Sequence, residues 1–325
     1  MKMPQYHNGF QPAWWLPGAH CQTVWPTLFR HRPALPLEKE RVTLADGDFI
    51  DLAWLEREKD SPLVLILHGL EGSINSPYAR GLMRHLQEAG FTSCFMHFRG
   101  CSGEPNRLDR SYHSGETGDV HEIVNHIRLR HQREVFAVVG FSLGGNVLLK
   151  WLGEQGDRAP LERAVAVSVP YRLADAAQRM NTGVSRIYQY HLLSRMKRKY
   201  REKYSRRPSP LSVDIASLKT FRAFDDQVTA PLHGFSGVDD YYQRSSSRQF
   251  VPLIRVPTLL LHASDDPFMY PATVPSAEEM PNGVILELSE KGGHVGFVSG
   301  QLPFSTRYHV DQRITQWLRE PFRRG

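Results

Sequence analysis

A serine flanked by glycines is the residue of this chain with the clearest chemical potential. Ser142 lies in Gly-Phe-Ser-Leu-Gly-Gly, residues 140–145, which has the spacing of the Gly-x-Ser-x-Gly nucleophile elbow. An apolar segment, 135–139, precedes it, and a helical pattern, 143–154, follows it. Small residues are needed because the strand turns sharply into the helix, whose N-terminus favours developing negative charge. The pattern predicts a catalytic serine.

A serine hydroxyl needs a base, and that base needs an acid to orient it. With this type of elbow the order along the chain is serine, acid, histidine. His294 lies in a glycine-rich loop near the end of the chain, whereas His309 falls in a helical pattern, so we predict His294 as the general base. The acid is expected after the apolar segment 258–262, where Asp265 and Asp266 are adjacent. We favour Asp266 and expect the other aspartate to bind loop N–H groups.

Two backbone N–H groups are needed to stabilise the oxyanion of an acyl-transfer intermediate. One is expected from Leu143, which follows the nucleophile. The other is expected from the loop His-Gly-Leu-Glu-Gly, residues 68–72, which follows an apolar segment, and Leu70 is its natural donor. We expect His68 to be structural. This chemistry requires no metal ion and no organic cofactor.

The elements that must position these residues alternate along the chain. Continuous apolar segments alternate with amphipathic helical ones, which predicts an α/β fold with a mostly parallel sheet flanked by helices. We expect a hairpin of strands at 42–44 and 49–54, further strands at 63–67, 92–98, 135–139, 164–169, 258–262 and 284–288, and helices at 78–89, 118–130, 143–154 and 308–319.

The alternation stops in the middle of the chain. Residues 170–255 contain no clear strand–helix unit, so we predict a largely helical cap or lid inserted between the sixth and seventh strands. The core is then formed by residues 41–169 and 256–325. Residues 1–40 are rich in proline and aromatic side chains and are expected to form an irregular N-terminal arm packed on the core.

The elbow, the His-Gly loop and the ordered triad resemble the α/β-hydrolase superfamily over roughly residues 40–320. A narrower resemblance is to the YheT-like esterases. It rests on Phe-Gln-Pro-Ala-Trp-Trp-Leu at 10–16, His-Cys-Gln-Thr at 20–23, Phe-Arg-Gly-Cys-Ser-Gly at 98–103 and Ser-Asp-Asp-Pro-Phe at 264–268.

The resemblance implies an α/β-hydrolase fold and hydrolysis of carboxylic esters, with Ser142, Asp266 and His294 as the catalytic set. It also places the family acid at Asp266. One position departs from the family, because Glu71 stands where threonine is common. An acidic residue at the mouth of the site is expected to disfavour anionic substrates.

Three histidines recur at five-residue intervals in the helical segment before the elbow. They are His121, His126 and His131. A helix turns about 100° per residue, so successive members of this set are about 140° out of phase. We therefore expect them to be solvated and not to converge on a metal ion.

The formal net charge of +6 is concentrated in one segment. Residues 186–207 carry a net charge of +8, and the remaining 303 residues sum to −2. No nucleic-acid recognition motif accompanies this charge, so a nucleic-acid partner is not expected. Residues 185–205 have an amphipathic helical pattern. Either they attract anionic lipid or acyl carriers, or they form a lid helix with a packed apolar face and a solvated basic side. We favour the second interpretation.

These features predict a carboxylesterase that acts on small-molecule esters. A lipid-directed lipase or acyltransferase at a membrane surface is the alternative, and contact of the cap with anionic lipid would accompany it. A non-catalytic binding module is less expected, because a receptor does not need an intact triad. Three cysteines and the lack of an apolar leader favour a reducing, cytoplasmic setting. The substrate, its acyl length and the oligomeric state are left open by the sequence.

Overall fold

The computed structural model describes residues 9–205 and 207–320. The strands of the main sheet are β1 (Glu38–Thr43), β2 (Phe49–Leu55), β3 (Leu63–Leu67), β4 (Thr92–Met96), β5 (Val135–Phe141), β6 (Arg163–Val167), β7 (Thr258–Ala263) and β8 (Val284–Ser289). The helices packed on that sheet are α2 (Ala79–Glu88), α3 (Gly118–His131), α4 (Leu143–Gln155) and α10 (His309–Arg319).

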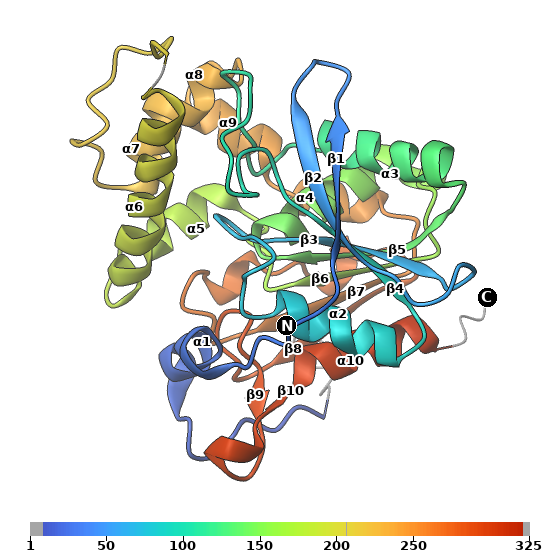
Figure 1. Ribbon diagram of the computed structural model, residues 1–325. Helices are drawn as coiled ribbons and strands as arrows, with labels where there is room; N and C mark the ends of the chain where they lie inside the picture. The colour runs from blue at the N-terminus through green and yellow to red at the C-terminus, as the bar shows by residue number, and fades with distance from the viewer. Residues whose placement is uncertain (1–8, 206, 321–325) are drawn as a thin grey trace.

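The main sheet of the described residues has eight strands in the order β1-β2-β4-β3-β5-β6-β7-β8 (Figure 1). β2 pairs antiparallel with β1 and β4, and all other neighbours are parallel. The mostly parallel α/β sheet predicted from the sequence is therefore confirmed. In a sheet of this kind the carboxyl ends of the parallel strands meet at one edge, where ligand sites form.

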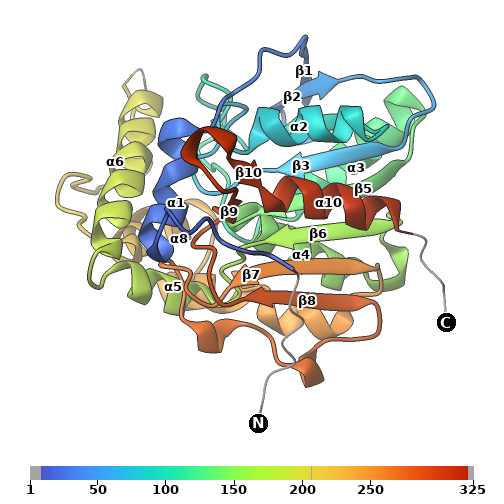
Figure 2. The same ribbon diagram turned by 90° about the horizontal axis from the view of Figure 1, so that it is seen from below.

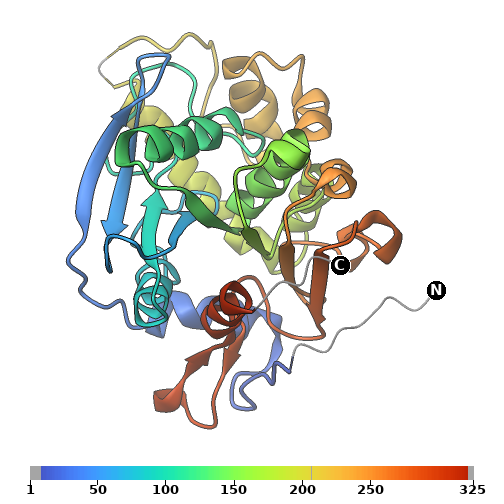
Figure 3. The same cartoon turned by 90° about the vertical axis from the view of Figure 1, so that its right-hand side faces the viewer.

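Helices cover both faces of the sheet, so the central strands are inaccessible to water. α2 and α10 lie on one face, and α3 and α4 lie on the other (Figures 2 and 3). Every residue of β3, β4, β6 and β7 is buried. This burial explains why β3 is a continuous apolar run and why valine, leucine and alanine predominate in β6 and β7.

The N-terminal arm is more regular than the sequence predicted. It contains a twelve-residue helix, α1 (Gly18–Phe29), with Pro26 inside it. The expectation of an irregular arm was wrong for these residues because tertiary contacts override the proline signal. The indole ring of Trp25 packs against Trp15 and Phe29, at centroid distances of 4.7 and 4.3 Å. The arm then meets the short hairpin of β9 (Val298–Ser299) and β10 (Arg307–Tyr308).

Between β6 and β7 the chain forms helices and loops, and the described residues there contain no strand. The helices are α5 (Leu173–Met180), α6 (Ser185–Lys203), α7 (Phe221–Phe224), α8 (Ala230–Leu232) and α9 (Val238–Ser245). We refer to residues 170–255 as the cap. Its longest helix, α6, stands at the side of the sheet (Figure 1). Within residues 9–205 and 207–320, every helix is too short or too polar to cross a lipid bilayer.

The prediction that the α3 histidines do not converge was wrong for two of them. His126 and His131 both bind the carboxylate of Glu40 in β1, with Nε2–O distances of 2.7 and 3.0 Å. The difference in helical phase is real, but β1 runs beside the end of α3. One carboxylate can therefore be approached by two rings from different directions.

Candidate active site

Ser142 lies at the sharp turn between β5 and α4, with φ +52° and ψ −117°. This left-handed conformation is strained for a residue with a side chain, and close packing holds it. A Cβ atom on Gly140 would lie 2.5 Å from the Gly144 carbonyl oxygen, and one on Gly144 would lie 2.5 Å from the His68 carbonyl oxygen. The Ser142 N–H donates to the Val167 carbonyl at 2.8 Å. Glycine is thus required at 140 and 144 because a side chain at either position would clash with the backbone.

The residues predicted as nucleophile, base and acid lie in one hydrogen-bonded row. His294 Nε2 lies 3.0 Å from Ser142 Oγ, and His294 Nδ1 lies 2.8 Å from Asp266 Oδ2. With the proton on Nδ1, the imidazole donates to the carboxylate and its Nε2 is able to accept the serine proton. Asp266 is buried, so its charge acts on the imidazole with little screening by water.

Of the two adjacent aspartates, Asp266 is the one that contacts His294. Asp265 points the other way, and its Oδ1 accepts the N–H of Gly293 at 2.9 Å. Burial raises the pKa of Asp265 above its usual value. Asp265 therefore shapes the loop that carries the predicted base, and Asp266 contacts the ring of His294.

Two residues that hold His294 were missed in the sequence. The ring of Phe268 stacks on the imidazole, and Thr23 Oγ1 in α1 accepts the backbone N–H of His294 at 2.9 Å. Next to it, the Gln22 side chain bonds both the N–H and the carbonyl of Val298, at 2.7 and 3.1 Å. These residues lie inside the segments 20–23 and 264–268 that carry the family resemblance, which was the signal available for finding them.

The predicted oxyanion donors lie beside the nucleophile. A Cβ atom on Gly69 would lie 3.2 Å from Ser142 Cβ, so the loop after β3 approaches the elbow closely. The N–H groups of Gly69 and Glu71 donate to tyrosine hydroxyls, each at 2.9 Å. By contrast, the N–H groups of Leu70 and Leu143 have no hydrogen-bond partner among the described residues. Both are available to a substrate oxygen.

His68 holds the oxyanion loop and carries no charge. Its Nδ1 lies 2.7 Å from the Gly69 carbonyl oxygen, and its Nε2 accepts the N–H of Phe98 at 3.1 Å. Burial lowers the pKa of His68 to about 3. The ring is therefore neutral near pH 7, and both of its nitrogens are occupied by the backbone.

A cavity of about 440 Å³ opens over the nucleophile between the core and the cap. Ser142, Leu70 and Leu143 line its floor. Its cap side is largely apolar and includes Ala177, Met180, Leu192, Met196, Phe221, Phe224, Val228 and Leu232. The volume lies within the range of small-molecule sites, and the apolar wall suits a hydrocarbon group.

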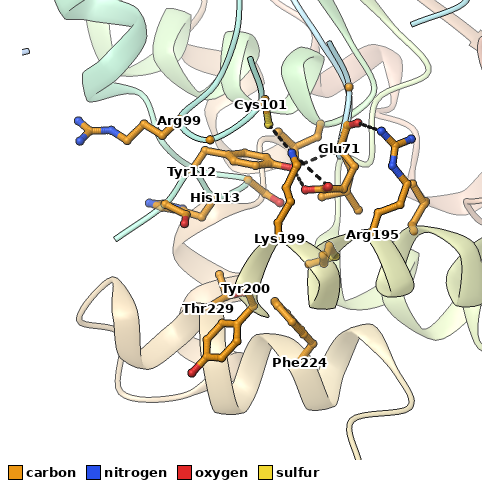
Figure 4. A pocket seen from close by; sticks show the side chains of 18 of the residues that line it. Glu71, Arg99, Cys101, Tyr112, His113, Arg195, Lys199, Tyr200, Phe224 and Thr229 are labelled. Atoms are coloured by element: carbon orange, nitrogen blue, oxygen red, sulfur yellow. Dashed lines mark hydrogen bonds and ion pairs between the residues drawn. The ribbon is translucent and has the colours of Figure 1, made fainter. Parts of the chain in front are cut away.

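Glu71 does not present a free negative charge to this cavity, contrary to the sequence-based expectation. The residue is 3% exposed, and its carboxylate forms an ion pair with Lys199 of α6 at 3.1 Å (Figure 4). The Tyr112 hydroxyl donates to the other carboxylate oxygen at 2.9 Å. Arg195 donates to the Glu71 carbonyl at 2.7 Å, and the Lys199 ammonium also contacts Cys101 Sγ at 3.0 Å.

The sequence favoured a lid helix whose basic side is solvated. For α6 this holds for only some of the basic residues, because others contact the core. Arg195, Lys199 and Lys203 are spaced by four residues and therefore share one helix face. That face is turned toward the core, where Lys203 donates to the carbonyls of Asp109 and Arg110, both at 2.9 Å. The solvated basic side is formed by the exposed residues Arg186, Arg198 and Arg201.

The sequence of residues 62–301 matches the family described as the alpha/beta hydrolase fold. The chain belongs to this family. YheT of Escherichia coli (strain K12), described as an esterase, is 41% identical to this α/β hydrolase over 95% of this chain and 92% of its own length. A monoacylglycerol lipase of Saccharomyces cerevisiae is 31% identical over 82% of this chain and 59% of its own.

A more distant relative is named as a phospholipase, and a solved structure shares the fold. Phospholipase ABHD3 of Homo sapiens is 25% identical over 99% of this chain and 81% of its own. The solved structure of the Pyrococcus furiosus esterase Pf2001 has a TM-score of 0.59 at 16% identity, over 88% of this chain and 90% of that one. The chain is thus an esterase- or lipase-type α/β hydrolase.

Proposed function

We propose that this hydrolase is a serine carboxylesterase that acts through Ser142, His294 and Asp266. The observation that carries the proposal is the unbroken row from Ser142 Oγ through the imidazole to the buried Asp266 carboxylate, with distances of 3.0 and 2.8 Å. The row ends at a serine that lines the cavity beneath the cap. This geometry supports the roles of nucleophile, base and orienting acid at a position that an ester can reach.

The reaction has two steps. Ser142 Oγ attacks the ester carbonyl carbon while its proton passes to His294 Nε2, and the oxyanion accepts the N–H groups of Leu70 and Leu143. The imidazolium, stabilised by Asp266, then protonates the leaving alkoxide, so that an alcohol departs and an acyl-serine remains. His294 next takes a proton from water, which attacks the acyl carbon. The imidazolium then gives that proton to the departing Ser142 Oγ, so that the carboxylic acid is released and the Ser142 hydroxyl and the neutral imidazole are restored.

The cavity supports an ester with an apolar acyl group as the substrate. Its cap wall presents methionine, leucine and phenylalanine side chains, and an acyl chain bound there would remove apolar surface from water. Two of the relatives are named as lipases of monoacylglycerols and phospholipids, which fits this class. We assign the acyl chain to the cap side and the scissile carbonyl to the floor near Ser142.

An ester panel tests the proposal. p-Nitrophenyl esters of increasing acyl length, a monoacylglycerol and a phospholipid would be compared for wild type and Ser142→Ala, with fluorophosphonate labelling in parallel. We expect Ser142→Ala to lower hydrolysis at least about 10³-fold and to abolish labelling. Ser194→Ala, an exposed serine of α6, is the control and should behave as wild type. Folded wild type that neither reacts with the probe nor cleaves any ester would instead indicate a binding module.

A second candidate, a lipase that works at a membrane surface, is favoured by several exposed apolar side chains. Ile187 and Tyr190 of α6 are 67% and 75% exposed, and Phe304, between β9 and β10, is 87% exposed. Leu28 and Phe29 at the end of α1 are exposed as well. α1 lies beside the β9–β10 hairpin and near α6 in both views (Figures 1 and 2). Exposed apolar side chains on a helix that also carries exposed arginines suit an anionic lipid surface.

Liposome flotation separates the two candidates. A membrane lipase should float with vesicles that contain phosphatidylserine, and Ile187→Ser combined with Tyr190→Ser should reduce the bound fraction. The esterase panel with soluble substrates should be unaffected by these two changes. Absence of binding to both neutral and anionic vesicles at low salt would rule out the membrane candidate and leave the esterase.

A further inference from the structure

A cluster of metal-ligating side chains lies away from the proposed catalytic residues. It consists of Glu40 in β1 and of His126 and His131 in α3. The elements β1 and α3 lie side by side (Figures 1 and 3). α3 ends at His131, just before β5 begins, whereas Ser142 follows the opposite end of that strand. The seven residues of β5 alone separate the two ends by about 20 Å. The cluster therefore has no part in ester cleavage.

Both imidazoles aim the same nitrogen at one carboxylate. His126 Nε2 lies 2.7 Å from Glu40 Oε1, and His131 Nε2 lies 3.2 and 3.0 Å from the two carboxylate oxygens. The ligand atoms of the three residues all lie within 4.8 Å of one another, and among the described residues this is the group of three that meets that condition. Imidazole nitrogen and carboxylate oxygen are ligands that Zn²⁺ accepts in proteins.

The distances between these atoms suit an ion held among them. Zn–N and Zn–O bonds are about 2.0–2.2 Å long, so two ligand atoms in a tetrahedral site lie roughly 3.3 Å apart. The present Nε2–O separations are shorter by a few tenths of an ångström, as expected where hydrogen bonds occupy the place of the ion. Small side-chain rotations are enough to open the site, and the partly exposed His131 leaves room for a water ligand.

A neighbouring tryptophan fixes the carboxylate. Trp54 Nε1 donates to Glu40 Oε2 at 2.9 Å, and the Trp54 ring lies against the ring of His131, with centroids 4.8 Å apart. The carboxylate is thus held in one orientation, like metal ligands held by groups of a second layer.

We propose that Glu40, His126 and His131 bind one Zn²⁺ ion, with water completing the coordination. The ion links an edge strand of the sheet to α3. Each imidazole binds the ion through Nε2 in its neutral form, so the proton that Nε2 shares with the carboxylate moves to Nδ1 or is released to water. Its effect is to clamp the β1–β2 hairpin to the core.

Isothermal titration of metal-free protein with ZnCl₂ tests the site. We expect one ion per chain. Glu40→Gln, His126→Asn and His131→Asn should each weaken binding at least tenfold, and Trp54→Phe should weaken it by about tenfold. His121→Asn is the matched control, because this exposed histidine lies on the same helix but outside the cluster.

Two further readouts make the result decisive. Co²⁺ bound to wild type should give the visible absorption of a low-coordinate nitrogen and oxygen site, and the spectrum should be lost in the His126→Asn/His131→Asn double variant. Zn²⁺ should raise the melting temperature of wild type and of His121→Asn but not of the double variant, whose fold is checked by circular dichroism and ester hydrolysis. Zn²⁺ affinity that is undetectable in wild type, or unchanged in the folded double variant, would overturn the proposal.

Discussion

The ring of Phe268 stacks on the imidazole of His294, with centroids 4.0 Å apart and ring planes at 10°. The backbone N–H of Phe268 also donates to Asp266 Oδ1 at 2.8 Å. Phe268 therefore fixes the ring plane of the proposed base. It also binds the oxygen of the proposed acid that does not contact the imidazole. The aspartate uses its other oxygen for the imidazole, so the two contacts do not compete.

Replacing Phe268 by leucine should lower kcat without a matching change in KM. The stacking contact is lost, which at about 0.5–1.5 kcal/mol corresponds to roughly a two- to tenfold lower kcat. The backbone bond to Asp266 is retained, and leucine keeps the wall apolar. Phe221→Leu is the control, since Phe221 lines the same cavity from the cap and should alter KM instead. Equal losses of kcat in steady-state assays of the two variants would contradict this role.

Thr23→Val should slow catalysis through the backbone of the histidine loop. The substitution keeps the shape of the side chain but leaves the His294 N–H without its acceptor in α1. A cost of about 1 kcal/mol in the positioning of the base corresponds to a roughly fivefold lower kcat. Thr27→Val, on an exposed position of the same helix, should retain the wild-type rate. If both variants retain it, the hydroxyl of Thr23 does not position the base.

The ion pair between Glu71 and Lys199 should show strong energetic coupling. Lys199→Met leaves a buried carboxylate unpaired and should lower the free energy of unfolding by about 3 kcal/mol. Glu71→Gln combined with Lys199→Met should recover at least about 1 kcal/mol of that loss, measured by urea denaturation. Arg198→Met, next to Lys199 but exposed, should change stability by less than about 0.5 kcal/mol. Strict additivity of the single variants would show that the pair is uncoupled.

His262 of β7 should make stability depend on pH. Burial lowers the pKa of this histidine to about 4, whereas the unfolded chain has an ordinary value of about 6.5. Between these values the unfolded state binds more protons, so stability falls as the pH falls through this window. The decrease in the free energy of unfolding between pH 7 and pH 4.5 should be about 2 kcal/mol smaller in His262→Leu than in wild type.

The measurement for His262 is chemical denaturation of both proteins at the two pH values. Leucine is tolerated there because the residue is 1% exposed and its Nδ1 has no hydrogen-bond partner in the described structure. The exposed His121→Gln should keep the wild-type dependence. Parallel pH profiles for wild type and His262→Leu would show that another group controls acid stability.

Local patterns predicted the core strands because their burial on both faces leaves an unbroken apolar run. β3 was located residue for residue at 63–67. The elbow at Ser142 was equally local, since its glycines are required by contacts within a few residues and with the neighbouring strand. Asp266 was favoured over Asp265, and the family resemblance supported that choice. Spacing alone could not settle it, because the direction of a side chain in a loop is not encoded in spacing.

Contacts between distant segments were the ones that the sequence did not reveal. Thr23 contacts His294 although 271 residues separate them in the sequence, and Lys199 contacts Glu71 across the boundary between cap and core. Charge counting showed where the basic residues of α6 are but not which of them turn inward. The Glu40 cluster was missed because helical phase was considered without the strand that runs beside α3.

The contacts of α1 with the histidine loop impose an order on the synthesis of a working enzyme. Thr23 leaves the ribosome 271 residues before its partner His294. The elbow around Ser142 lies between them in the sequence and can form earlier. A nascent chain can thus carry the proposed nucleophile without the proposed base, so the proposed activity begins only when the histidine loop has met α1.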